Sequence, residues 1–288
     1  MIKDFIVLTK FVLSFAVSLS ALFAYIMAKG VIEIDMFIAT FAVLLVALGV
    51  STINQVQEYK EDARMERTKH RPIASGKMSP TTGLIIAGVL ILSSLILIYD
   101  LLGLTGVNLF LFSFIWYNGF YTPLKKKSAF AVIPGAILGV VPPAIGWLAA
   151  GHSLMELEFY ALGIFYFIWQ VPHFWLLVML HYGGYKDAGY PTAMKFFGKN
   201  SLQRMTFIWI LFTIQAGIYL TLVFKIQSTV ILGLLIALIP LTVLSSVRLL
   251  YRDFELLHAR QVFREFNILF LCTVIFITID VMMRTANV

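Results

Sequence analysis

Nine apolar runs of roughly 20 residues divide this chain, and they restrict its fold more than any other feature. A helix of about 20 residues, rising about 1.5 Å per residue, crosses a hydrocarbon core about 30 Å thick. Membrane-spanning strands would alternate in character, whereas a run such as LIIAGVLILSSLILIY is apolar on every face. The pattern predicts an all-α, polytopic integral membrane bundle of about nine transmembrane helices, near residues 9–29, 36–55, 82–100, 107–122, 129–150, 157–180, 204–224, 229–250 and 265–283.

Composition agrees with lipid as the main solvent, because 60% of the 288 residues are hydrophobic and only 13% are charged. The first apolar run lacks a clear small-residue cleavage site and is interpreted as a retained helix. The single cysteine, Cys272, allows no intrachain disulfide. We expect one transmembrane domain over residues 1–288.

The 22 lysines and arginines indicate an orientation, since cytoplasmic loops carry an excess of them. With nine crossings, all but Lys29, Lys225 and Arg284 fall on the N-terminal side. That side is therefore predicted to be cytoplasmic, in a bacterial inner membrane. The inner loops at 56–81, 123–128, 181–203 and 251–264 are expected to cap an active site. No basic and aromatic recognition module is present, so no nucleic-acid partner is expected.

The most informative loop begins with a polar ladder, which we define as Asn54, Glu58 and Asp62. Their i, i+4, i+8 spacing places them on one face of a continued helix. Carboxylate and amide oxygens so arranged suit Mg²⁺ that is shared with a phosphate ligand. Basic side chains that could bind phosphate oxygens follow at Arg64, Arg67, Lys69 and Arg71. The alternative is a solvated juxtamembrane helix with arginines that only set topology.

The segment NQVQEYKEDARMERTKHRP resembles the UbiA superfamily of membrane prenyltransferases, and in particular its heme O synthase branch, which carries D-x-x-M-x-R-T-x-x-R-P. The resemblance implies magnesium-dependent farnesyl transfer from farnesyl diphosphate to the vinyl group of heme B, giving heme O and diphosphate. It assigns Asp62 to catalysis and one or two Mg²⁺ ions to the ladder. Glu58 departs from the aspartate that the family usually has there.

Three further segments fit the same family. The family's Y-x-x-x-K pattern is matched by Tyr121 and Lys125. The match implies that Lys125 binds the diphosphate and that Tyr121 hydrogen-bonds it or faces the allylic cation. The alternative is that the tyrosine lies at the membrane interface and the lysine only sets the topology. The segment GYKDAGYP aligns with the second acidic motif, but Gly184 stands where an acid is expected. This leaves Asp187 as the candidate metal ligand and Lys186 as a candidate diphosphate contact.

The third segment, WQVPHFW, matches the W-Q-x-P-H-F pattern of the heme branch. It implies a heme site formed by Trp169, His173 and Trp175, since an ionisable side chain inside a membrane helix is costly and usually functional. The alternative for His173 is a hydrogen bond at a proline kink.

Two other functions stay open at this point. A related prenyltransferase acting on an aromatic or quinone precursor would share the ladder but has no need of WQVPHF. A transporter is favoured only by the many helices and their prolines, and magnesium-dependent binding of a prenyl diphosphate would distinguish it. The expected partners are farnesyl diphosphate, heme B, membrane lipid and downstream heme or oxidase assembly proteins.

Overall fold

The structure is a computed structural model, and it describes residues 2–251 and 255–286. These residues form helices and connecting turns, with no strand among them. The long elements are α2 (Phe11–Lys29), α3 (Ile34–Asp62), α4 (Pro80–Phe114), α8 (Leu157–Leu180), α11 (Lys199–Val223), α12 (Thr229–Ser246) and α13 (Leu256–Ala286). Shorter elements are α1 (Ile2–Leu8), η1 (Ile115–Tyr121), α5 (Thr122–Lys125), η2 (Ala129–Ala131), α6 (Val132–Ile137), η3 (Leu138–Val140), α7 (Val141–Ala149), α9 (Tyr182–Asp187), α10 (Ala193–Phe197) and η4 (Val247–Leu250).

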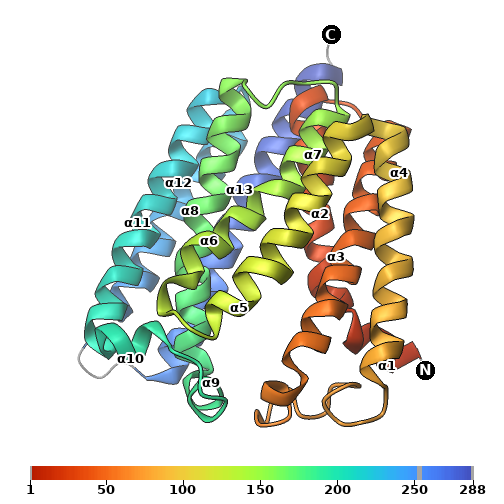
Figure 1. Cartoon of the computed structure of the whole chain (residues 1–288). Coiled ribbons are helices and arrows are strands. Elements are labelled where there is room, and N and C mark those ends of the chain that lie inside the picture. Colours follow the sequence, from red (N-terminus) through yellow and green to blue (C-terminus); the bar gives the residue numbers. More distant parts are fainter. Residues whose placement is uncertain (1, 252–254, 287–288) are drawn as a thin grey trace.

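Eight segments of the described chain are long and apolar enough to cross a membrane, and one of them, Pro80–Lys125, contains a reversal. Gly103 has φ 57° and ψ −146°, a conformation outside the helix that essentially only glycine adopts. Beyond it, Gly106 packs against the first limb, because a Cβ there would lie 2.6 Å from Cγ1 of Ile98. Counted as two limbs, this hairpin brings the crossings to nine, which confirms the predicted number (Figure 1).

The helices pack as two connected groups. In the first group, α2, α3, α4 and α7 contact one another, and in the second α8, α11, α12 and α13 do so; α2 also packs against α13. Helices α2 and α7 approach closely at Gly146, where a Cβ would lie 1.9 Å from the carbonyl oxygen of Ala21. Small residues allow such contacts between membrane helices.

One end of the bundle collects the polar connections. The N-terminus, α1, α5, α9, α10 and the loop at 63–79 lie at this end, and the C-terminal end of α13 lies at the other (Figure 1). Helix α3 continues beyond the predicted span at 36–55 and carries the ladder into this end. In the predicted loop 251–264, residues 252–254 lie outside the described part, and α13 already begins at Leu256.

Candidate active site

The ladder occupies the last three turns of α3 and is buried. Asn54 is 0% exposed, Glu58 4% and Asp62 2%. A solvated juxtamembrane helix would leave these side chains exposed, so that interpretation of the ladder is wrong. The three polar groups face the interior of the bundle, where an uncompensated charge is expensive.

Each ladder residue is paired with a cation of the same chain. Lys10 Nζ donates to Asn54 Oδ1 at 2.6 Å, and Lys125 Nζ lies 2.8 Å from the carboxylate of Glu58. Arg71 Nη1 donates to both oxygens of Asp62, at 2.9 and 2.7 Å. The like-charged pair Glu58 and Asp62 is thus neutralised by two separate partners. The site places acidic oxygens and the cationic groups of lysine and arginine side chains within one buried cluster.

Lys10 reaches the ladder because the chain breaks between α1 and α2. It adopts φ 49°, and Gln55 Nε2 donates to the carbonyl oxygens of Val7 and Leu8 at 2.6 and 2.9 Å. The orientation of the Asn54 amide is fixed, because its Nδ2 donates to Thr122 Oγ1 and its Oδ1 therefore faces Lys10. Burial, followed by repulsion from Arg71 and Lys125, lowers the pKa of Lys10 to about 7.

Tyr190 adds a contact from the connection between α9 and α10. Its hydroxyl donates to Glu58 Oε1 at 3.1 Å. Burial, together with the nearby charge of Glu58, raises the pKa of this phenol, so it stays a proton donor. Sequence reasoning missed both Tyr190 and Lys10. The only signal was that Tyr190 belongs to the GYKDAGYP segment, whereas Lys10 was counted as a topology residue.

Helices η1 and α5 contribute aromatic and basic side chains to the site opposite the ladder of α3. Lys125 lies over the ring of Tyr121, 5.5 Å from its centroid, and Tyr117 stacks on the same ring at 5.6 Å. A Cβ on Gly135 would lie 2.6 Å from Cε2 of Tyr121, so glycine gives this ring its space. The motif therefore brings an aromatic face and a cation to the ladder, beyond what a topology lysine requires.

Asn118 fixes η1 against α3. Its Nδ2 donates to the carbonyl oxygen of Val50 and to Gln57 Oε1, both at 3.1 Å, while Gln57 Nε2 donates back to the Asn118 carbonyl oxygen at 2.9 Å. The next lysine, Lys126, pairs with Glu61 at 2.8 Å near the surface. Two adjacent lysines thus bind two different acids of α3.

The other predicted ligands lie farther out. Four basic residues of the loop at 63–79 were predicted to bind phosphate, and of these Arg71 contacts the ladder. The other three, Arg64, Arg67 and Lys69, are exposed, and Lys69 pairs with Glu66 at 2.7 Å. Lys186 and Asp187 are exposed at the end of α9. Within residues 2–251 and 255–286, no group of three or more His, Cys, Asp or Glu side chains is placed to hold a metal ion.

His173 lies in a second polar position, between α8 and α13. Its Nδ1 is 2.8 Å from Asn267 Oδ1, and Asn267 Nδ2 donates to the carbonyl oxygen of Phe263 at 2.5 Å. The Phe263 contact orients the amide so that its oxygen faces the imidazole. Nδ1 therefore carries the proton, and Nε2 keeps its lone pair. This is an interhelical bond, unlike the helix-interior bond of the alternative interpretation.

The aromatic residues around His173 separate into two sets. Trp169 stacks on Phe270 with centroids 3.8 Å apart and lies 4.8 Å from the His173 ring. Trp175 points instead toward α11, where it meets Trp209 edge to face at 5.9 Å. The structure brings Trp169 and His173 together and turns Trp175 away from them.

The fold and the buried acid–base cluster define an α-helical integral membrane protein with a polar site at the N-terminal end of its bundle. A family model for the UbiA prenyltransferase family matches residues 8–272, and the chain belongs to this family. The predicted superfamily is thereby confirmed.

Curated relatives narrow the branch. A protoheme IX farnesyltransferase of Oleidesulfovibrio alaskensis is 41% identical over 175 residues, which cover 61% of this chain and 62% of that protein. One of Nitratidesulfovibrio vulgaris is 32% identical over 208 residues, or 72% of each chain. With 62% coverage, the chain spans slightly less than two thirds of the length of the Oleidesulfovibrio alaskensis protein. The predicted resemblance to the heme branch is confirmed.

Solved structures agree on the fold. A digeranylgeranylglyceryl phosphate synthase aligns with a TM-score of 0.78 at 16% identity, over 98% of both chains. A UbiA homolog from Archaeoglobus fulgidus, bound to GPP and Mg²⁺, aligns with a TM-score of 0.70 at 14% identity, over 97% of this chain and 99% of that one. At these identities the similarity establishes the shared helical architecture alone.

Proposed function

We propose that this chain transfers a farnesyl group from farnesyl diphosphate to a vinyl group of heme B, giving heme O and diphosphate. The observation that carries the proposal is the buried ladder with its three intrachain cations, in a chain similar to named protoheme IX farnesyltransferases. The apolar helices around this site suit an isoprenoid tail.

The residues at the ladder fit a magnesium ion. Asn54, Glu58 and Asp62 present hard oxygen donors, and each of these side chains already binds a cation. Bound Mg²⁺ would neutralise the charge of the leaving diphosphate. Asp187 remains a proposed ligand for a second ion, although its side chain is exposed.

The diphosphate is proposed to be bound by the three side chains that contact the ladder, Lys10, Lys125 and Arg71. Once the ladder oxygens take another partner, these side chains can turn to the phosphate oxygens, so the buried charges stay balanced. The exposed Arg64, Arg67, Lys69 and Lys186 are proposed to guide the charged substrate toward the site. Electrostatic stabilisation of the leaving group is the main source of rate enhancement.

The reaction breaks the bond between C1 of the farnesyl group and the diphosphate oxygen, whose electron pair leaves with the diphosphate. The π electrons of the vinyl group then form the new carbon–carbon bond. Water supplies a hydroxyl to the cation left beside the porphyrin ring and releases a proton. Tyr121 presents an aromatic face where an allylic cation would form.

His173 and Trp169 are the proposed acceptor site. The lone pair of His173 Nε2 suits the heme iron, and Asn267 orients the ring as such ligands require. The stacked indole of Trp169 offers a flat apolar wall for a porphyrin. Trp175, which faces α11, is proposed to support this wall only indirectly.

The distribution of lysine and arginine supports a cytoplasmic location for the N-terminal end of the bundle, in a bacterial inner membrane. Contact with downstream heme or oxidase assembly proteins stays a prediction.

The direct test uses the purified protein in lipid nanodiscs with heme B, farnesyl diphosphate and Mg²⁺, followed by mass spectrometry of the extracted heme. We expect a hydroxyethylfarnesyl heme. Unmodified heme, together with farnesylation of an added aromatic or quinone precursor, would refute the heme assignment and leave the family assignment intact.

A further inference from the structure

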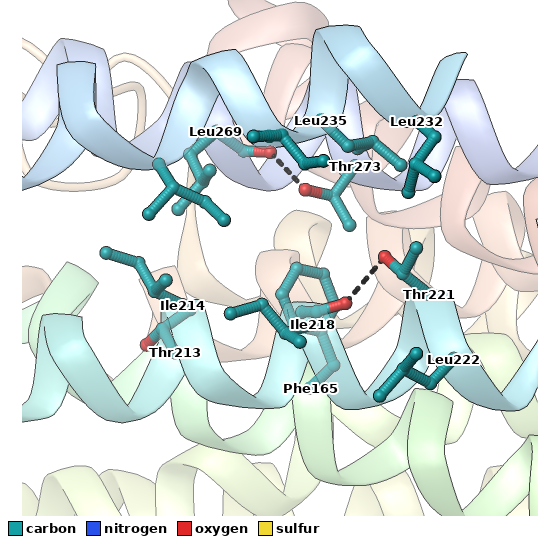
Figure 2. A pocket seen from close by; sticks show the side chains of 13 residues that line it. Phe165, Thr213, Ile214, Ile218, Thr221, Leu222, Leu232, Leu235, Leu269 and Thr273 are labelled. Atoms are coloured by element: carbon teal, nitrogen blue, oxygen red, sulfur yellow. Dashed lines mark hydrogen bonds between the residues drawn. The ribbon is translucent and has the colours of Figure 1, made fainter. Parts of the chain in front are cut away.

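A groove between α11 and α12 lies in the group of helices that does not carry the ladder. Its volume is about 250 Å³, and its floor is the buried ring of Phe165. Figure 2 shows Ile214 and Ile218 of α11 facing Leu235 and Thr273 across this space. Gly217 helps to keep it open, because a Cβ there would lie 3.3 Å from Cε2 of Phe165.

The groove offers no free polar group from its three threonines. The hydroxyls of Thr213, Thr221 and Thr273 each donate to the backbone carbonyl four residues earlier, at 2.9, 2.8 and 2.8 Å. Apolar cavities of about 150 Å³ remain free of water and accept hydrocarbon ligands. The chemistry of the lining therefore selects an aliphatic occupant over a heme or a diphosphate.

The open side of the groove faces the membrane. Its rim residues Leu222, Ile236 and Ile218 are 68%, 57% and 44% exposed within helices that cross the bilayer. These residues belong to the C-terminal half of α11 and the N-terminal half of α12, at the end of the bundle opposite the ladder. A prenyl diphosphate held at Asp62 would have its charged group at the wrong end for this groove.

A lysine follows the groove-lining Leu222 by three residues. Lys225 occupies the turn between α11 and α12 with φ 50°, its backbone N–H donates to the Leu222 carbonyl oxygen at 3.1 Å, and its side chain is exposed. The other two cations on this side are engaged, since Lys29 pairs with Glu33 and Arg284 with Asp280. Within the described chain, Lys225 has no such acidic partner.

We propose that the groove binds one acyl chain of a phospholipid from the leaflet at this end of the bundle, with Lys225 contacting the lipid phosphate. The aliphatic lining, the lateral opening and the single unengaged cation correspond to the tail and headgroup of one such molecule. The bound chain fills a gap between α11 and α12 that their own side chains leave.

The test uses phosphatidylglycerol with a photoreactive diazirine on one acyl chain, incorporated into nanodiscs with the full-length protein. Mass spectrometry of the irradiated protein is expected to place the label within residues 213–222 and 232–239. Ile218→Trp fills the groove and should reduce this labelling about tenfold. Ile208→Trp is the matched control, because Ile208 is 47% exposed on the same helix but does not line the groove.

Lys225→Gln tests the headgroup contact and should reduce labelling about fivefold, without moving the labelled residues. The proposal is overturned by equal labelling of the two tryptophan variants, by no effect of Lys225→Gln, or by stronger labelling from a diazirine analogue of farnesyl diphosphate than from the phospholipid. Folding of each variant is checked by its elution as a single species.

Discussion

One nitrogen of Arg71 contacts both carboxylate oxygens of Asp62, and this pair joins the end of α3 to the loop that follows it. Asp62 is 2% exposed, so the contact is an internal ion pair. Removing either partner of this ion pair would leave the other charge buried and unpaired, which destabilises the folded protein by about 3 to 5 kcal/mol.

Asp62→Asn should reduce the formation of farnesylated heme by about 100-fold or more, because it removes a charged oxygen donor to the Mg²⁺ that would neutralise the leaving diphosphate. The product is measured by mass in membranes and with purified protein. Glu66→Gln is the control, since Glu66 lies in the same segment but is exposed and pairs with Lys69 at the surface. Undiminished product from Asp62→Asn would remove this residue from the site.

Lys125 and Lys126 provide a matched pair of variants. Lys125→Met should lower turnover about 100-fold, because it removes the cation between Glu58 and the Tyr121 ring. Lys126→Met breaks the contacts to Glu61, which is 24% exposed, and to the carbonyl oxygen of Gln57, and should change turnover no more than about threefold. Similar losses in the two variants would show that general positive charge, rather than the position of Lys125, matters.

Chelation of divalent cations should abolish the reaction, and Mg²⁺ should restore it. Glu58→Gln is expected to raise the Mg²⁺ concentration for half-maximal rate by about 10- to 100-fold, because it removes a charged oxygen donor. Glu61→Gln serves as the comparison, as Glu61 lies three residues along α3 and contacts Lys126 instead. A magnesium requirement that is the same in both variants would contradict the ladder as the metal site.

His173→Ala should weaken heme B binding by about 10- to 100-fold, measured by the absorption of the bound heme. Binding of the prenyl diphosphate should stay unchanged, because His173 contacts Asn267 and aromatic rings rather than the ladder. Asn267→Leu should shift the heme spectrum as well, since the imidazole loses its orienting partner. His181→Ala, at the exposed end of α8, should leave the spectrum unchanged.

Gly103→Ala should destabilise the protein by about 1 to 3 kcal/mol, because alanine is strained at the φ and ψ of this reversal. Gly88→Ala is the control in the same helix; a Cβ there meets no atom within 4 Å, and alanine favours helix. The midpoint of unfolding in a denaturing detergent would measure both. Equal midpoints would show that the hairpin does not depend on glycine at residue 103.

Much of the fold follows from local pattern. The length and apolar character of the runs predicted nine crossings, and the i, i+4, i+8 spacing placed Asn54, Glu58 and Asp62 on one face of α3. Both features depend on residues close in sequence. The apolar span ends near residue 55, and the predicted continuation of its helix through the ladder is confirmed, because α3 ends at Asp62.

The partners of the ladder depend on tertiary structure. Lys10 reaches Asn54 only through the break that Gln55 stabilises, and Tyr190 meets Glu58 from 132 residues away. No periodicity encodes such contacts. The motif WQVPHFW likewise gave Trp169 and Trp175 the same role, although six residues on a helix turn them toward different neighbours.

The reversal at Gly103 also makes the number of crossings odd in the part of the chain that the structure describes. Helix α1 and the C-terminal end of α13 consequently lie at opposite ends of the bundle (Figure 1). A reporter or affinity tag attached at the first end shares its compartment with the ladder and the polar loops, whereas one attached at the second end faces the other compartment. A pair of such reporters would therefore read out the sidedness of the protein in intact cells without altering any residue of the site.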